Sequence, residues 1–183
     1  MKIDREFQFR GDRNYLHSAA VFDDLLKLRG ADATKIDLKF HRRTVQQVIY
    51  TDDPEATGRA VAEWSDSGGK LYIVEREDGI SNRVVYDEPS LARMLEIDGR
   101  IVRIPAETPG FTRIEALVAG FKLLLQTVHA GVERKYVFVR IRLDRCPEGA
   151  MEIRYSRGIG VFFQGDIAET GKGIVGQIFF GTW

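Results

Sequence analysis

The alternation of hydrophobic and polar positions along the chain predicts one structural unit that occurs twice. Residues 15–30 carry hydrophobic side chains at helical spacing and end at a glycine, which predicts an amphipathic helix. Residues 34–76 follow with the period-two alternation typical of hairpin-linked strands. Residues 111–131 predict a second, longer helix, and residues 135–183 predict a second run of strands.

The segments around the two helices complete this pattern. A strand is expected before each helix, at residues 6–10 and 100–104. The connector between the halves carries a short strand at residues 83–86 and a short helix after Pro89. Gly120 stands inside the second helix, where glycine costs about 1 kcal/mol relative to alanine, so we expect a close packing contact there.

The repeat predicts the domain organisation. The first half covers residues 1–88 and the second half residues 89–183, and together they are expected to form one compact pseudo-dimeric domain. Phe22 in the first helix aligns with Val118 in the second, and Phe40 aligns with Ile141 in the strands that follow. This is similarity of pattern rather than identity of residues, so a single α+β domain with two unrelated helices is the alternative.

Composition narrows the class of protein. Hydrophobic residues make up 44% of the 183 residues, which suffices for a full core, and the 27 basic and 27 acidic residues cancel. That balance argues against a dedicated nucleic-acid-binding protein. The single cysteine excludes an internal disulfide and fits a reducing compartment. Without a signal-peptide pattern or a membrane-spanning stretch, we expect a cytoplasmic protein with no membrane partner.

A helix followed directly by several strands, present twice, resembles the hot-dog fold. In that fold a curved, mainly antiparallel sheet wraps a central helix, and two units join their sheets. The resemblance implies an α+β, double hot-dog-like fold with two helices packed on such a sheet. It also implies hydratase, dehydratase or thioesterase activity on a small-molecule acyl thioester of coenzyme A or acyl carrier protein. No cofactor is implied, and a homodimer is left open.

One local string resembles a more specific family. Residues 9–17 read Phe-Arg-Gly-Asp-Arg-Asn-Tyr-Leu-His, similar to the hydratase motif of MaoC-like hot-dog enzymes, Gly-Asp-any-Asn-Pro-Leu/Ile-His. The resemblance implies that Asp12 and His17 are the catalytic acid/base pair and that Asn14 binds the substrate. An Asp and a His in one pocket can share the water that adds across an enoyl thioester. N–H groups at the helix N-terminus would polarise the thioester carbonyl.

The string departs from the family pattern in two ways. Tyr15 stands where the motif has proline, and the motif runs straight into the helix without the family's additional segment. A structural interpretation therefore competes with the catalytic one. In the structural interpretation, Asp12 or Asn14 caps the helix and His17 is an ordinary helix residue.

The entrance of the second helix carries different residues. Glu107 and Glu115 are candidate substrate-binding carboxylates there, because some hot-dog thioesterases place a helix carboxylate beside the thioester. Thr112 and Glu115 also have the spacing of a capping box, which is the interpretation we favour for Glu115. The three histidines lack metal-ligand spacing, so no metal is expected. A catalytic site would then be single and lie at the first helix, and a non-catalytic module that binds an acyl ligand or assembles with partners is the remaining alternative.

Overall fold

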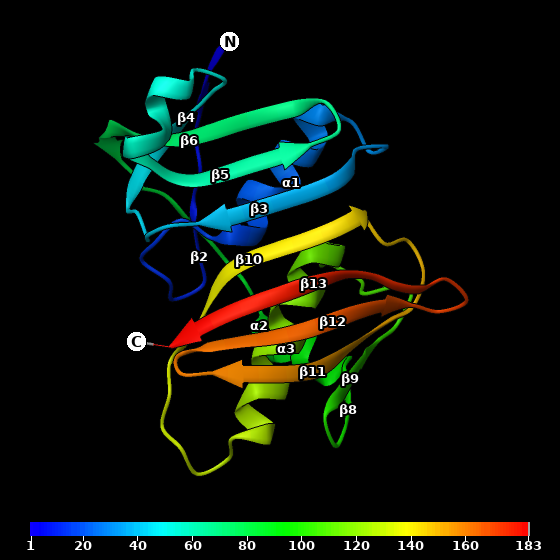
Figure 1. The fold of residues 1–183 in the computed structure, drawn as a ribbon. Helices are drawn as coiled ribbons and strands as arrows, with labels where there is room; N and C mark the ends of the chain where they lie inside the picture. Colours follow the sequence, from blue (N-terminus) through cyan, green and yellow to red (C-terminus); the bar gives the residue numbers. More distant parts are fainter. Residues whose placement is uncertain (183) are drawn as a thin grey trace. The chain divides into compact units, whose positions relative to one another are not determined.

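The computed structural model describes residues 1–182, in which the chain forms a first unit, Met1–Asp87, and a second unit that begins at Glu88 (Figure 1). The sequence pattern put the boundary between residues 88 and 89. Each unit contains a helix and an antiparallel sheet, so the α+β class is confirmed. Trp183, the last residue of the second predicted run of strands, lies outside the described residues.

The first unit has one longer helix and five strands that form an antiparallel sheet in the order β1–β4–β6–β5–β3 among the described residues. Two further short strands, β2 and β7, pair in parallel beside it. The elements in chain order are β1 (Lys2–Arg5), β2 (Phe9–Arg10), α1 (Ser18–Arg29), β3 (Thr34–Phe40), β4 (Gln46–Thr51), η1 (Pro54–Arg59), β5 (Ala60–Asp66), β6 (Gly69–Gly79) and β7 (Arg83–Val84).

The strands after α1 are not a simple run of hairpins, which corrects the prediction for residues 34–76. Strand β6 pairs with both β4 and β5 and lies between them, so β4 and β5 are joined by a crossing connection. This connection contains the 3₁₀ helix η1, which the sequence pattern missed. The Asp53 carboxylate accepts a hydrogen bond from the Glu55 N–H group at 3.0 Å, and Pro54 opens the turn. Ala56 of η1 is buried against Tyr72 of β6, which holds the crossing in place.

Helix α1 begins three residues later than predicted, at Ser18 instead of residue 15. The preceding backbone is engaged elsewhere, because the Leu16 N–H group donates a 2.8 Å hydrogen bond to the Thr44 carbonyl. The buried face of the helix packs on the sheet, where Phe22 meets Trp64 of β5 edge to face at 5.1 Å. Both rings are fully buried, and each such side chain stabilises the fold by roughly 1.5–3 kcal/mol.

The second unit has the sheet order β10–β13–β12–β11–β9–β8, with consecutive hairpins joining β11, β12 and β13. The β11–β12 hairpin of this unit stands where the first unit has the crossing between β4 and β5, and the β12–β13 hairpin corresponds to β5–β6. The elements of this unit are α2 (Glu88–Arg93), β8 (Glu96–Asp98), β9 (Ile101–Ile104), α3 (Arg113–Val128), β10 (Tyr136–Arg145), β11 (Met151–Ile159), β12 (Phe162–Glu169) and β13 (Gly173–Thr182).

No helix in residues 1–182 is both long and apolar enough to cross a membrane.

Helix α3 packs its predicted hydrophobic stripe on this sheet. Phe121 meets Phe180 of β13 edge to face, with ring centroids 5.4 Å apart. The expected close contact at Gly120 is confirmed, because a Cβ atom there would lie 3.3 Å from the Ile104 side chain of β9. Glycine thus lets the helix approach the sheet more closely than alanine would.

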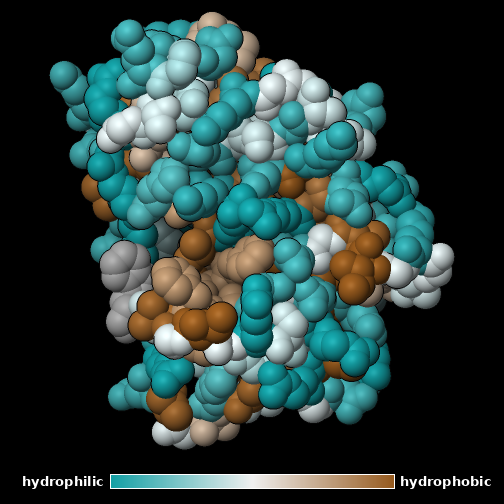
Figure 2. Space-filling model, in the orientation of Figure 1, coloured by the Kyte–Doolittle hydropathy of each residue, from teal (hydrophilic) through white to brown (hydrophobic). Residues whose placement is uncertain are grey.

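Some hydrophobic side chains of the second unit stay outside its core. Figure 2 shows hydrophobic atoms gathered on the visible face near the hairpin that joins β11 and β12. Ile159, Val161 and Phe162 of this hairpin are each more than half exposed. Scattered exposed apolar residues are normal, but a group of three on one turn marks a surface that the unit itself does not cover.

Candidate functional site

His17 lies at the N-terminus of α1 and is buried, with only 4% of its surface exposed. It occupies the N-cap position, but its side chain makes no capping hydrogen bond to the helix. The structural interpretation with Asp12 or Asn14 at the cap is therefore wrong. A buried imidazole stands instead where a short polar cap usually does, beside the N–H groups of the first turn that have no intrahelical acceptor.

The connector after β6 builds the surroundings of His17. The Tyr86 ring lies 5.4 Å from the His17 ring, and the Arg13 guanidinium lies 5.1 Å from the centre of the Tyr86 ring. The parallel pair β2–β7 fixes this arrangement, because Gly11 donates a 3.0 Å hydrogen bond to Val84. Tyr86 is the residue at this entrance that sequence patterns missed, since nothing in its neighbourhood indicates a partner so far away in the chain.

Asp12 and Asn14 occupy the turn between β2 and α1, and both are exposed. His17, a few residues on, is buried. The structure therefore brings His17 together with Tyr86, whereas it leaves the Asp12 carboxylate and the Asn14 amide on the solvent side of the turn. Arg83 holds the backbone of this turn by donating hydrogen bonds to the carbonyls of Gly11 and Arg13, the latter at 2.8 Å.

The entrance of α3 is organised as a helix cap. The Thr112 hydroxyl accepts a hydrogen bond from the Glu115 N–H group at 3.2 Å, and the Glu115 carboxylate accepts one from the Thr112 N–H group at 2.8 Å. The capping box that the sequence predicted is confirmed. Glu115 is buried at 4% exposure, whereas Glu107 is exposed in the preceding turn.

A second buried carboxylate near this entrance was not predicted. Glu169, at the end of β12, accepts hydrogen bonds from the Gly149 N–H group and the Lys172 ammonium, both at 2.8 Å. Burial opposes its ionisation, but Lys172 and the N–H groups of Gly149 and Glu148 outweigh it and lower the pKa of Glu169. A carboxylate held ionised by this many donors is structural, because it is a poor proton acceptor.

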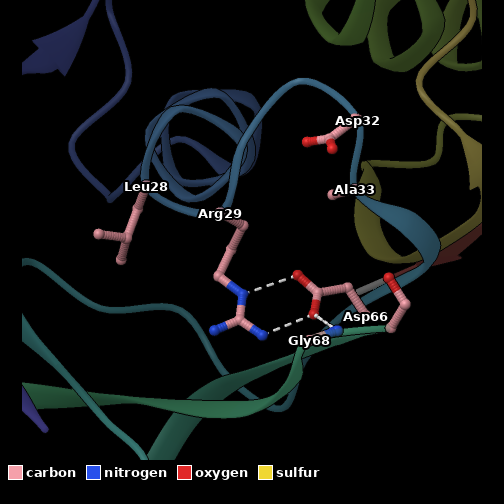
Figure 3. A pocket seen from close by; sticks show the side chains of 7 residues that line it. Leu28, Arg29, Asp32, Ala33, Asp66 and Gly68 are labelled. Carbon is pink, nitrogen blue, oxygen red and sulfur yellow. Dashed lines mark hydrogen bonds and ion pairs between the residues drawn. The ribbon is translucent and has the colours of Figure 1, made fainter.

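A hollow of about 330 Å³ lies at the C-terminal end of α1 (Figure 3). The buried Asp66 carboxylate accepts hydrogen bonds from Arg29 Nε and Trp64 Nε1, both at 2.8 Å, and from Arg29 Nη2 and the Gly68 N–H group, both at 2.7 Å. The Arg29 guanidinium is the main cause of the lowered pKa of Asp66, and Asp66 in turn raises the pKa of Arg29. With all its acceptor positions occupied, Asp66 fixes the β5–β6 turn to α1 and does not act as an acid or base.

The described residues were also compared with the side-chain clusters that bind metal ions. Within residues 1–182, no group of three or more His, Cys, Asp or Glu side chains is arranged so that it could hold a metal ion. Within the described part of the chain, the buried imidazole of His17 is the main candidate for acid/base chemistry.

Comparison with known proteins identifies the fold. No family model and no curated protein sequence matches the chain. The solved structures that are similar to it include two whose TM-score reaches 0.5. A monomeric dehydratase domain from a trans-AT polyketide synthase split module shares 10% identity over 100% of both chains, with a TM-score of 0.50. A tesB protein from Mycobacterium avium subspecies paratuberculosis shares 11% identity over 100% of this chain and 92% of that chain, with a TM-score of 0.55.

The chain has a hot-dog fold. The predicted resemblance is thus confirmed at the level of the fold. At these identities the likeness concerns the backbone architecture and not the chemistry of individual side chains. The activity of the hot-dog chain has to be argued from its own residues.

Proposed function

We propose that this hot-dog protein is an acyl-thioester enzyme of the hydratase or dehydratase type, with His17 as its central acid/base group. The observation that carries the proposal is the buried imidazole at the N-terminus of α1, which does not cap the helix. An imidazole beside the first-turn N–H groups of a helix places an acid/base group next to donors for a carbonyl oxygen, and this combination favours a role in acyl chemistry.

Each residue of the entrance has a role in this proposal. In hydration, the water oxygen bonds to the β carbon of an enoyl thioester while a proton is delivered to the α carbon; dehydration is the reverse. His17 takes the proton from water and delivers it to the α carbon. Asp12, exposed on the solvent side of the turn, contacts the substrate as it enters. The first-turn N–H groups of α1 stabilise the negative charge that develops on the thioester carbonyl oxygen. Asn14 positions the substrate over the turn.

Positive charge around this entrance supports a phosphate-bearing carrier. Arg10 and Arg13 flank the Asp12 turn, and Arg83 lies against it through its hydrogen bonds to the turn carbonyls. Arg43 lies over the Tyr15 ring, 4.7 Å from the ring centre. Such a cluster attracts the phosphates of coenzyme A or of the prosthetic group on acyl carrier protein. The thioester end of either carrier would then be directed toward His17.

A hydrolase is the second candidate function, and Glu115 is the observation that favours it. This carboxylate is buried at the entrance of α3, where hot-dog thioesterases are expected to place a base. Its capping hydrogen bond to Thr112 opposes that role, because an acceptor already in use is a weaker base. Glu107, exposed in the preceding turn, would contact the carrier.

A homodimer is a further proposal, and light scattering of the purified protein tests it directly.

The test of the main proposal is turnover by His17→Ala on a panel of enoyl and 3-hydroxyacyl thioesters of coenzyme A and pantetheine. Loss of general acid/base catalysis is expected to slow hydration by about 10²–10⁴-fold. His41→Ala is the matched control, because His41 is partly exposed and pairs with Glu63 at 3.4 Å on the same unit. Circular dichroism and thermal unfolding establish that both variants are folded.

Three outcomes separate the candidate functions. Loss of hydration in His17→Ala with normal activity in His41→Ala supports the hydratase. Release of free thiol by the wild type, abolished in Glu115→Gln and retained in His17→Ala, selects the hydrolase instead. Wild-type protein that turns over no thioester of the panel but binds acyl thioesters rejects both and leaves the binding module.

A further inference from the structure

Four aromatic side chains meet at the C-terminal end of α3, where they form what we call the His129 cluster. His129, the C-cap of the helix, lies 5.3 Å from the Phe163 ring of β12 and 5.6 Å from the Tyr155 ring of β11. Tyr136, at the start of β10, lies 5.4 Å from Phe163. Three consecutive strands, β10, β11 and β12, thus converge on one imidazole.

Two arginines border the His129 cluster. The Arg100 guanidinium carbon lies 4.3 Å from the centre of the Tyr155 ring, and that of Arg134 lies 5.8 Å from the centre of the Phe163 ring. Both arginines are exposed, and within residues 1–182 neither forms an ion pair with a carboxylate. Stacking on an aromatic ring holds a guanidinium in place but does not neutralise its charge. The N–H groups along the edge of the guanidinium plane can therefore still donate hydrogen bonds to a ligand.

Two buried polar atoms face the same region. His129 Nε2 is shielded from solvent and has no hydrogen-bond partner among the described residues. Tyr136 Oη is shielded as well; Arg134 acts on it as a donor, so the phenol proton still lacks an acceptor there. Tyr136 as a whole is only 6% exposed. A buried polar group without a partner costs about 1–3 kcal/mol, so a ligand or water that supplies the missing acceptor stabilises the cluster.

The pKa shifts of His129 and Tyr136 agree with a positive potential at the cluster that comes from Arg100 and Arg134. Burial is the main cause of the lowered pKa of His129, and the charges of Arg134 and Arg100 lower it further. Burial raises the pKa of Tyr136, against the opposing effect of Arg134. Both groups are therefore neutral near pH 7, and both can donate a hydrogen bond. The titratable groups that act on His129 are thus cationic or neutral.

We propose that the His129 cluster is a binding site for a phosphate-type oxyanion, held between Arg100 and Arg134 with His129 and Tyr136 as further donors. The C-terminal end of α3 opposes an anion with about half an elementary charge, but two guanidiniums outweigh it. Phosphate suits the site better than a carboxylate, because its oxygens can accept hydrogen bonds from several donors at once. The site uses none of the residues assigned to turnover, so it stands or falls independently of the proposed function.

A linkage follows from the lowered pKa of His129. An anion at the cluster favours the imidazolium, so bound phosphate raises the pKa of His129. By the same linkage, the affinity for phosphate increases as the pH falls toward that pKa. A merely structural aromatic cluster would show neither effect, which makes the histidine titration the decisive readout.

The experiment titrates the folded protein with inorganic phosphate and follows the His129 imidazole by NMR. We expect saturable binding, an upward shift of the pKa of His129, and at least about a tenfold weaker affinity in Arg100→Ala and Arg134→Ala, which corresponds to about 1.4 kcal/mol. Arg103→Ala is the matched control, since Arg103 on β9 is paired with Glu96 and Asp98 at 3.0 and 2.9 Å. Thermal unfolding establishes that the variants are folded.

Additional probes identify the source of the phosphate group. Tighter binding of 4′-phosphopantetheine than of inorganic phosphate supports the site and assigns it to a thioester carrier. Equal binding of the two supports a site for free phosphate. The proposal is overturned if the His129 signals do not respond to phosphate, if acetate binds as tightly as phosphate, or if Arg103→Ala weakens binding as much as the two cluster variants.

Discussion

Replacing Asp66 by alanine tests the interpretation that the Arg29–Asp66 pair is structural. The substitution removes a carboxylate whose side chain is 2% exposed and which accepts four hydrogen bonds from Arg29, Trp64 and Gly68. It also leaves the Arg29 guanidinium, 18% exposed, without its counter-ion. Because Arg29 ties the end of α1 to the β5–β6 turn, we expect the first unit to lose stability as a whole.

The magnitude follows from burial. Removing one partner of a buried ion pair costs about 3–5 kcal/mol, since the other charge stays desolvated. Arg29 can turn toward solvent in the adjoining hollow, so the cost should lie near the lower end, at about 3 kcal/mol. For a chain of this length that corresponds to a decrease in Tm of about 6–12 °C.

Urea denaturation followed by circular dichroism, with thermal unfolding as a second readout, measures this difference. Glu75→Ala is the control, because the Arg42–Glu75 pair has side chains that are 51% and 31% exposed and should contribute only about 0–1 kcal/mol. In an Arg29→Met background the cost of Asp66→Ala should decrease by at least about 1 kcal/mol, since no charge is left stranded. Equal costs for Asp66→Ala and Glu75→Ala, or no coupling to Arg29, would refute the reasoning.

Three further predictions concern the second unit. Gly176→Ala should destabilise the protein by about 1–3 kcal/mol, because its Cβ would lie 2.2 Å from a backbone carbonyl oxygen, whereas Gly58→Ala, with nothing within 4 Å, should be nearly neutral in urea unfolding. Glu115→Gln should keep the cap and lie within about 0.5 kcal/mol of wild type, whereas Glu115→Ala should cost about 1 kcal/mol; a large loss in Glu115→Gln would show that the charge matters more than the cap. The lowered pKa of His129 means that the unfolded chain binds its proton at higher pH, so the unfolding free energy should fall as the pH decreases below the ordinary value of 6.5, and His129→Gln should remove that part of the pH dependence.

Local features of the helices could be predicted from the sequence. The hydrophobic stripe of α3 and the capping box of Thr112 and Glu115 were expected, and the structure contains both. Gly120 was expected to mark a close contact and lies against Ile104. Each of these features depends on residues three or four positions apart or on a single backbone position, and such relations follow directly from helix geometry.

The start of α1 shows where local patterns fail. Residues 15–30 have helical periodicity throughout, yet the helix begins only at Ser18 because Leu16 hydrogen-bonds to Thr44. The cap position then falls on His17, a residue with low intrinsic preference for it. A contact from another part of the chain therefore decided which residue stands at the candidate site.

The amino-acid sequence by itself determined the helices, most of the strands and the order in which they follow one another. It did not determine that β6 lies between β4 and β5, that Tyr86 lies against His17, or that Arg29 meets Asp66, 37 residues away. Periodicity tells which face of an element is buried but not against which partner, because many distant segments offer an equally hydrophobic face. Only the tertiary structure chose among those partners, and it thereby placed a buried imidazole at the N-terminus of α1 and a cationic aromatic cluster at the C-terminus of α3.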